Sequence, residues 1–313
     1  MKPTSKRRTK PWRLAINLII IVVVVFFIIT QAGRFKASWQ VLSSVSDWQV
    51  SLGLIATGLT YVIAASIYRL LAFKRLPFGL TFLVEVSTAF ANRLLPAGLG
   101  GLGLNGVYLH KRGHSLAEAT AVVSINNLIG IAGHLLLLLA LVVISPSVFS
   151  WPGISIGSSD IMIVTGLVII LVVIISVWRA ARRRVASFGQ NLGRSLVRYL
   201  KNPQKLLLAL MLAMLLTLLY VFTLWISAHA VGLSIAPVDI FVIFTIGVLV
   251  GTVTPTPGGL VGVEAGLYAG FASHQAAAAP ALAAVLLFRV ITYWLPLAPG
   301  FIALLLVRQK HIV

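Results

Sequence analysis

Six long apolar stretches constrain this chain more than any other feature. Each is at least 18 residues long, and a helix needs about 20 apolar residues to cross the hydrocarbon core of a bilayer. Hydrophobic residues make up 59% of the chain and charged residues only 10%, whereas soluble domains carry about 25% charged residues. The sequence therefore predicts an all-α polytopic membrane protein with about six full transmembrane helices. The stretches are 14–31, 51–73, 115–144, 160–178, 206–230 and 280–307.

Two glycine-rich runs, 95–101 and 256–262, repeat one another at a distance of 161 residues. Each follows an apolar stretch of about 16 residues, which is too short to span a bilayer. Interrupted hydrophobic segments in corresponding halves of a chain are typical of transporter binding sites. We expect both runs to form backbone elbows at membrane depth. The elbow residues are Pro96, Gly98, Gly100, Gly101, Pro257, Gly258, Gly259 and Gly262.

The basic residues gather in a few segments. Of the 25 Lys and Arg residues, 21 lie in the N-terminal tail, at 69–75, at 111–112, at 179–205 and in the C-terminal tail. The positive-inside rule places these segments in the cytoplasm, together with both termini, for a protein of the cell membrane. The net charge of +19 therefore does not indicate a nucleic-acid partner.

This topology decides how the two interrupted regions enter the membrane. Region 80–110 has Lys74 before it and Lys111 after it, so both of its ends are cytoplasmic. Region 238–273 begins and ends outside, if helix 280–307 is to end inside. The chain then reads as two re-entrant helical hairpins in an inverted-topology repeat. The alternative, two ordinary crossings with glycine-rich connections, stays open at this point.

One membrane domain with two repeat halves accounts for the whole chain. The second half is divided by a basic segment that either lies on the cytoplasmic membrane surface or serves only as a linker. The parts are a basic cytoplasmic tail at 1–13, a first half at 14–144, an external loop at 145–159, a second half at 160–178 and 206–307, and the basic segment at 179–205.

Four charged residues fall inside apolar regions: Glu85, Arg93, Glu264 and Arg289. A charge near the bilayer centre costs several kcal/mol, so such residues normally face a cavity or one another and mark a substrate path. An offset of about 163 residues from Arg289 leads to Asn126 and Asn127 in the first half. The alternative is an internal ion pair that only holds the helices together. Glu118 differs, because Ser115-x-x-Glu118 is a capping box at a helix start.

Residues 10–307 resemble the flippase-like membrane domain of lysylphosphatidylglycerol synthetases of the multiple peptide resistance factor type. The resemblance rests on Asn92-Arg-Leu-Leu-Pro-Ala-Gly-Leu-Gly-Gly, on Thr256-Pro-Gly-Gly-Leu-Val-Gly-Val-Glu264, and on Arg289 followed by Tyr293-Trp-x-Pro296. It implies an integral membrane fold that moves phospholipids, aminoacylated phospholipids or polyprenyl-linked lipids between leaflets. Two positions depart from the family pattern: Val261 replaces a common glycine, and Asn126-Asn127 replace a charged pair of some members.

These features together predict a lipid translocase with no catalytic residue, no metal and no cofactor. Arg93 and Arg289 would bind a phosphate headgroup and Glu264 a cationic group. The synthetase domain of fused members is not found in this sequence, so we expect a stand-alone member that does not make aminoacyl lipid. Two alternatives remain: an accessory protein that partners a lipid-modifying or glycosyl-transferring enzyme, and a small-solute transporter. The predicted substrate-binding residues are Arg93, Asn92, Glu264, Arg289, Glu85, Asn126, Asn127 and Tyr293.

Overall fold

A computed structural model describes residues 45–94, 99–144, 193, 197–199, 201–254, 256–310 and 312–313. Within these ranges the chain is helical and contains no strand. The elements are α2 (Asp47–Leu71), α3 (Phe78–Leu94), α4 (Leu99–Lys111), α5 (Leu116–Ile144), α8 (Pro203–Ala230), α9 (Pro237–Val253), the 3₁₀ turn η4 (Pro257–Gly259), α10 (Gly262–Ser273), α11 (Ala278–Arg289), the π-helix η5 (Val290–Trp294) and α12 (Leu297–Gln309).

Four helical segments are long and apolar enough to cross a membrane, which makes the chain a membrane protein with several spans. They are Asp47–Leu71, Leu116–Ile144, Pro203–Ala230 and Ala278–Gln309. These segments match four of the six predicted spans. The other two, 14–31 and 160–178, lie outside the described residues.

The last of these segments is not the regular helix that its hydropathy predicts. After α11 the chain passes into the π-helix η5, where Leu295 N–H donates to the Val290 carbonyl at 2.9 Å. Pro296 follows, and a proline has no N–H to continue the helical hydrogen bonds. A single π-helical turn in a longer helix often accompanies a functional site, and here it carries Tyr293.

The two interrupted regions form two pairs of short helices. The longest, α3 and α9, have 17 residues, or about 26 Å of helix, and α10 has 12 residues, or about 18 Å. Glycines allow each pair to pack closely, since a Cβ on Gly266 would lie 2.9 Å from the Gly247 Cα. Small residues at such contacts are typical of membrane helices.

Three of the predicted elbow glycines lie at the adjoining helix ends and allow this packing. Gly100 and Gly101 lie in the first turn of α4, where a Cβ on Gly100 would collide with the Ala91 backbone of α3. Gly262 begins α10, and a Cβ there would overlap Thr254 at the end of α9. At all three positions the close approach of two helix ends leaves no room for a side chain.

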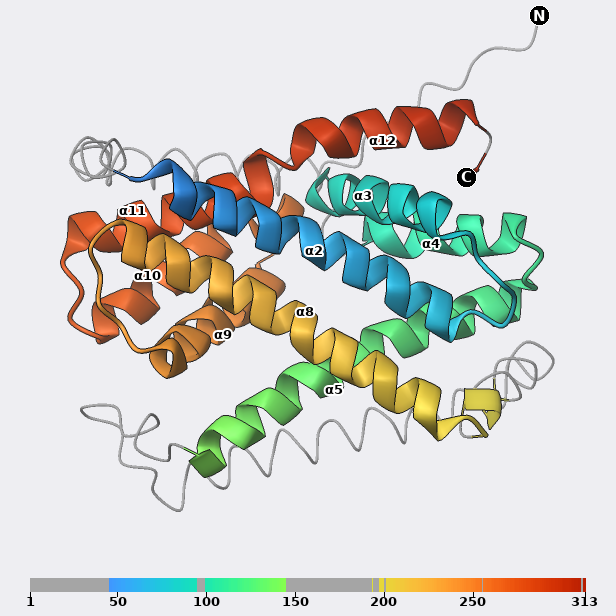
Figure 1. Ribbon diagram of the computed structural model, residues 1–313, viewed down its shortest axis with the longest axis horizontal. Helices are drawn as coiled ribbons and strands as arrows, with labels where there is room; N and C mark the ends of the chain where they lie inside the picture. Colours follow the sequence, from blue (N-terminus) through green and yellow to red (C-terminus); the bar gives the residue numbers. More distant parts are fainter. Residues whose placement is uncertain are drawn as a thin grey trace, which may run out of the picture.

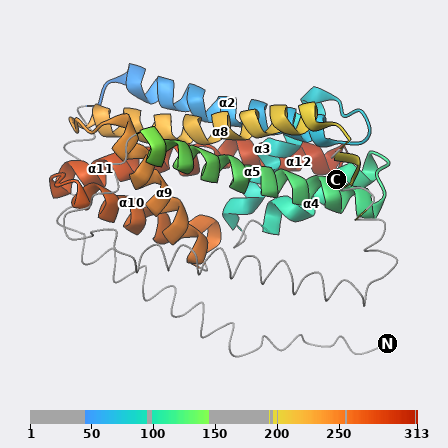
Figure 2. The ribbon, with the colours of Figure 1, turned by 90° about the horizontal axis from the view of Figure 1, so that it is seen from below.

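Polar contacts hold the open ends of each pair together. At the α3–α4 end, the Lys74 ammonium donates to the Gly113 carbonyl and the Lys74 N–H to the His114 ring. At the α9–α10 end, His274 Nε2 lies 3.6 Å from Asp239 Oδ1. Figures 1 and 2 show that these two open ends point to opposite ends of the molecule.

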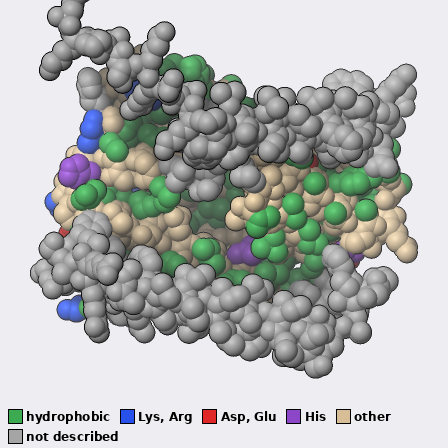
Figure 3. All heavy atoms as spheres, turned by 180° about the vertical axis from the view of Figure 1, so that it is seen from behind, with side chains coloured by type: hydrophobic (Ala, Val, Ile, Leu, Met, Phe, Trp, Pro, Cys, Tyr) green, Lys and Arg blue, Asp and Glu red, His purple; other side chains and the backbone are tan. Residues whose placement is uncertain are grey.

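Each helix pair packs into its own hydrophobic core. One core joins α3 and α4 to the ends of α2, α5, α8 and α12, and the other joins α9, α10 and α11 to the second half of α8. Where it is described, the face in Figure 3 shows hydrophobic side chains among backbone and other side chains, and its Lys and Arg side chains gather at one edge. That edge is the end at which α4 and α12 finish in Figure 1. At the same end, Tyr199 donates to the Leu71 carbonyl at 2.8 Å.

Candidate functional site

Arg93 lies at the last turn of α3 and is buried. Its guanidinium donates to the Ala89 carbonyl at 2.7 Å and to the Tyr61 hydroxyl at 3.3 Å. A third hydrogen bond reaches the Thr292 carbonyl of the π-helix. Arg93 therefore connects α3 with α2 and with the last transmembrane segment.

Pro296 explains why the Thr292 carbonyl is available to Arg93. In a regular helix this carbonyl would accept a hydrogen bond from the N–H four residues later, which is the position of the proline. Because Pro296 has no N–H, the Thr292 oxygen needs another donor. The sequence Tyr293-Trp-x-Pro296 thus creates an acceptor for an arginine 199 residues away.

The second arginine forms an ion pair beside the first. Arg289 Nε donates to Glu264 Oε1 at 2.7 Å, and its Nη2 lies 3.4 Å from the Gly258 carbonyl. The Tyr293 ring lies against both guanidinium groups, with its centroid 4.3 Å from the Arg289 Cζ and 5.6 Å from the Arg93 Cζ. We call Arg93, Glu264, Arg289 and Tyr293 the arginine cluster.

The second elbow closes over this cluster. Gly258 and Gly259 have positive φ angles of 59° and 67°, which glycine adopts without strain. A Cβ on Gly258 would lie 2.5 Å from the Tyr293 ring and 3.2 Å from the Arg93 Cα. The Pro257–Gly259 turn therefore sits against the end of α3, directly before the first elbow. Pro96 and Gly98 of that first elbow lie outside the described residues.

The charges of the arginine cluster do not balance. Two guanidinium groups face one carboxylate, which leaves one positive charge, and Arg93 itself contacts only neutral oxygens in the described structure. Arg93, Arg289 and Tyr293 are all buried. A buried charge is costly unless it is paired, so this cluster is suited to bind an anion.

The remaining predicted residues form a separate group on α3 and α5. They line a polar cavity of about 430 Å³ that contains no basic side chain in its lining, and an adjoining cavity of about 340 Å³ shares Glu85, Asn126 and Asn127. Asn92 belongs here too, where its side-chain oxygen accepts the Gly101 N–H. The residues that line the polar cavity are Tyr68, Glu85, Thr88, Asn92, Gly101, Leu102, Asn105, Asn126, Asn127 and Ile131.

The eight predicted residues therefore divide into the arginine cluster and the polar cavity. Sequence reasoning missed Tyr61 and Thr292 beside the arginines, and Tyr68, Thr88 and Asn105 in the cavity. Asn105 stands alone among apolar residues of α4, which is a signal that marks it. The carbonyl of Thr292 gives no such signal, because it depends on the π-helix.

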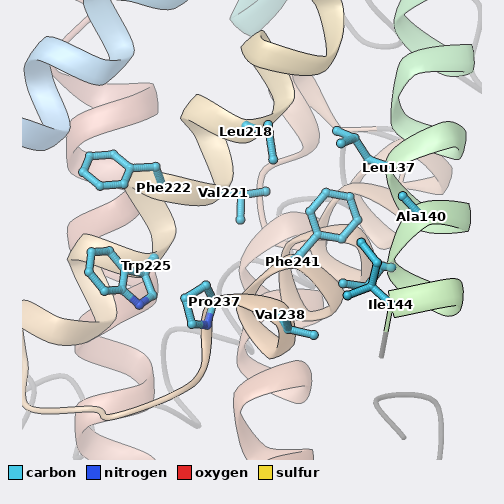
Figure 4. A pocket seen from close by; sticks show the side chains of 11 residues that line it. Leu137, Ala140, Ile144, Leu218, Val221, Phe222, Trp225, Pro237, Val238 and Phe241 are labelled. Carbon is cyan, nitrogen blue, oxygen red and sulfur yellow. The ribbon is translucent and has the colours of Figure 1, made fainter. Parts of the chain in front are cut away.

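A third cavity, of about 460 Å³, is apolar and lies between α5, α8 and α9. In Figure 4, Leu137 and Ile144 of α5 face Phe241 of α9, with Val221 of α8 beside them. Its lining contains no charged side chain. It lacks the groups that would recognise a charged headgroup, and the candidate site is therefore restricted to the arginine cluster and the polar cavity.

Comparison with known proteins agrees with the helical membrane fold. Among curated proteins, none matches the chain. The family model described as "Lysylphosphatidylglycerol synthase TM region" matches residues 14–300. This match covers both helix pairs, the arginine cluster and the polar cavity. The chain therefore belongs to the family of lysylphosphatidylglycerol synthase transmembrane regions.

Proposed function

We propose that the protein is a lipid translocase of the cell membrane that moves an anionic lipid headgroup past the arginine cluster. The observation that carries the proposal is the unbalanced positive charge of Arg93 and Arg289, buried where the second elbow meets α3. A lipid phosphate is an anion that arginine binds through two parallel hydrogen bonds. The membership in a family of membrane regions from lipid synthases supports a lipid as the substrate.

The two helix pairs supply the path in this proposal. Both would enter the membrane as re-entrant hairpins, α3–α4 from the cytoplasm and α9–α10 from the exterior, as two halves of an inverted repeat. Non-helical backbone at membrane depth is tolerated where protein or water surrounds it. Separation of the halves on one side or the other would expose Arg93 and Arg289 alternately, while the acyl chains stay in the bilayer.

The other members of the cluster have different tasks. Glu264 Oε2 is buried without a hydrogen-bond partner among the described residues, so it is available to a cationic group of the same headgroup. Glu264 Oε1 holds the Arg289 side chain in place. The proposal assigns no bond-making or bond-breaking step to the chain and needs no cofactor.

Transfer of headgroup-labelled lipids between leaflets of proteoliposomes tests the proposal. The panel contains phosphatidylglycerol, an aminoacylated phosphatidylglycerol, a polyprenyl phosphate and phosphatidylcholine. Arg93→Gln should slow transfer by about 10- to 100-fold, because a hydrogen bond to a charged group is worth about 1.5–3 kcal/mol. Arg308→Gln is the matched control, since Arg308 is exposed at the end of α12. Transfer of no lipid above that of empty vesicles, or equal rates for wild type and Arg93→Gln, contradicts the proposal.

A further inference from the structure

The polar cavity beside α3 contains oxygen atoms that no described residue satisfies. Glu85 Oε1, Thr88 Oγ1 and Asn105 Oδ1 are all buried and lack a hydrogen-bond partner. The Glu85 residue is only 7% exposed. A carboxylate and an amide oxygen can only accept, so each of these two atoms needs a donor or a cation. Buried polar atoms without partners are rare and call for an explanation.

The charge of the cavity has one sign. Glu85 supplies a carboxyl group, and neither this cavity nor the adjoining one has a Lys, Arg or His in its lining. No ion pair of the described residues includes Glu85. Asn105 and Tyr68 line the cavity together with Glu85, and neither side chain adds a positive charge. An ionised Glu85 therefore requires a positive ligand.

The donor set limits the kind of cation. The cavity offers oxygen atoms from a carboxylate, a hydroxyl and side-chain amides, and it has no thiolate or imidazole. Oxygen ligands select hard cations and also accept the N–H groups of an ammonium ion. With one carboxylate, the ligand that leaves the site neutral carries a single positive charge.

We propose that the polar cavity binds a monovalent cation, with Glu85 as the counter-charge and Thr88, Asn105 and Asn126 as oxygen ligands. An alkali metal ion and a primary ammonium group share this chemistry. The site lies on the same helix as Arg93, eight residues earlier, or about 12 Å along the axis. Its walls come from α2, α3, α4 and α5, so a bound cation would hold these helices together. The proposal does not rest on lipid transport.

Thermal unfolding of the purified full chain in detergent tests this site without a transport assay. The protein is heated in NaCl, KCl or methylammonium chloride, each at the ionic strength of a reference buffer with the bulky cation N-methyl-D-glucamine. A ligand that binds only the folded state raises the unfolding temperature in a concentration-dependent way. We expect a rise of a few degrees that saturates with at least one small cation. Glu85→Gln should abolish the rise, and Asp47→Asn, an exposed carboxyl group in the first turn of α2, should retain it.

Comparison of the alkali metal salts with methylammonium chloride identifies the ligand. A rise with Na⁺ or K⁺ alone assigns an alkali metal site, and a rise with methylammonium alone assigns a site for an ammonium group. Equal unfolding temperatures in all four buffers overturn the proposal, as does a rise that survives in Glu85→Gln. If Glu85→Gln does not fold, Asn126→Leu removes one ligand at a partly exposed position, and we expect the half-saturating concentration to increase several-fold. An unchanged half-saturating concentration in Asn126→Leu then counts against the site.

Discussion

Val261 adopts a backbone conformation that its side chain does not favour. It follows the second elbow with φ 70° and ψ −43°, a region that is a clear outlier for a β-branched residue. Such strain costs about 1–3 kcal/mol. A glycine lowers the stability of the folded state by about 0.5–1 kcal/mol, because it has more conformational freedom to lose on folding. We expect Val261→Gly to increase the free energy of unfolding by about 1 kcal/mol in denaturant titrations of the detergent-solubilised protein. Val263→Gly, in the first turn of α10, should decrease it, and a decrease in both variants contradicts the strain argument.

Single residues show what the sequence can and cannot predict about the site. Arg93, Glu264 and Arg289 stand out because charges are costly in apolar surroundings, and the structure brings all three together. The same rule marks Glu85, and the offset of about 163 residues from Arg289 marks Asn126 and Asn127, but neither reveals that these residues face a different cavity. Which side of α3 a residue occupies relative to its neighbours depends on packing, and Arg93 and Asn92 are adjacent in sequence with separate partners.

Among the elements, the loop between α4 and α5 is connected to the segment before α3 by a buried histidine, His114. The Lys74 N–H donates to His114 Nε2 at 3.2 Å, so that nitrogen is unprotonated, and Nδ1 donates to the Leu109 carbonyl at 3.0 Å. Burial lowers the pKa of His114 below its ordinary value of 6.5. The folded protein therefore contains the neutral form of the His114 imidazole.

This histidine gives the helix pair a pH-dependent stability. Above pH 6.5 both folded and unfolded states hold a neutral His114, so the residue causes no pH dependence there. As the pH falls below 6.5, the unfolded state binds a proton that the folded state resists, and stability decreases. We expect wild type to lose more unfolding free energy between pH 8 and pH 5 than His114→Gln does. Parallel pH profiles for the two proteins would show that this ring does not titrate as argued.

Secondary structure follows from the sequence where hydropathy and capping agree. The capping box at the start of α5 is confirmed, since Ser115 N–H donates to Glu118 and Glu118 N–H donates to the Ser115 hydroxyl. The sequence does not reveal the π-helix after Arg289, because hydropathy does not distinguish a π-helix from a regular α-helix. Its cause is a local proline combined with a distant arginine, and only the folded chain brings these two together.

At the scale of the whole molecule, the positions of the basic residues and of the side-chain ion pairs distinguish the same two ends of the structure. The Glu118–Arg198 pair at 3.0 Å joins the first half to the basic segment before α8, at the end where Lys74 contacts the α4–α5 loop. The Asp239–His274 pair lies at the opposite end. Charge counting could predict this division, because positive residues are retained on one side of a membrane. It could not predict that α3 and the second elbow would meet at an arginine.

The division of the molecule into two ends predicts which positions an impermeant reagent can reach. The chain contains no cysteine, so single substitutions give single labels. We expect Lys111→Cys at the end of α4 to resist a membrane-impermeant thiol reagent in intact cells and to react after permeabilisation. Ala277→Cys, exposed between α10 and α11, should react in intact cells, and Lys310→Cys after α12 should behave like Lys111→Cys. If α3 and α4 together crossed the membrane, Lys74 and Lys111 would lie on opposite sides of it. Labelling of Lys111→Cys in intact cells would therefore contradict the re-entrant hairpin and indicate a crossing.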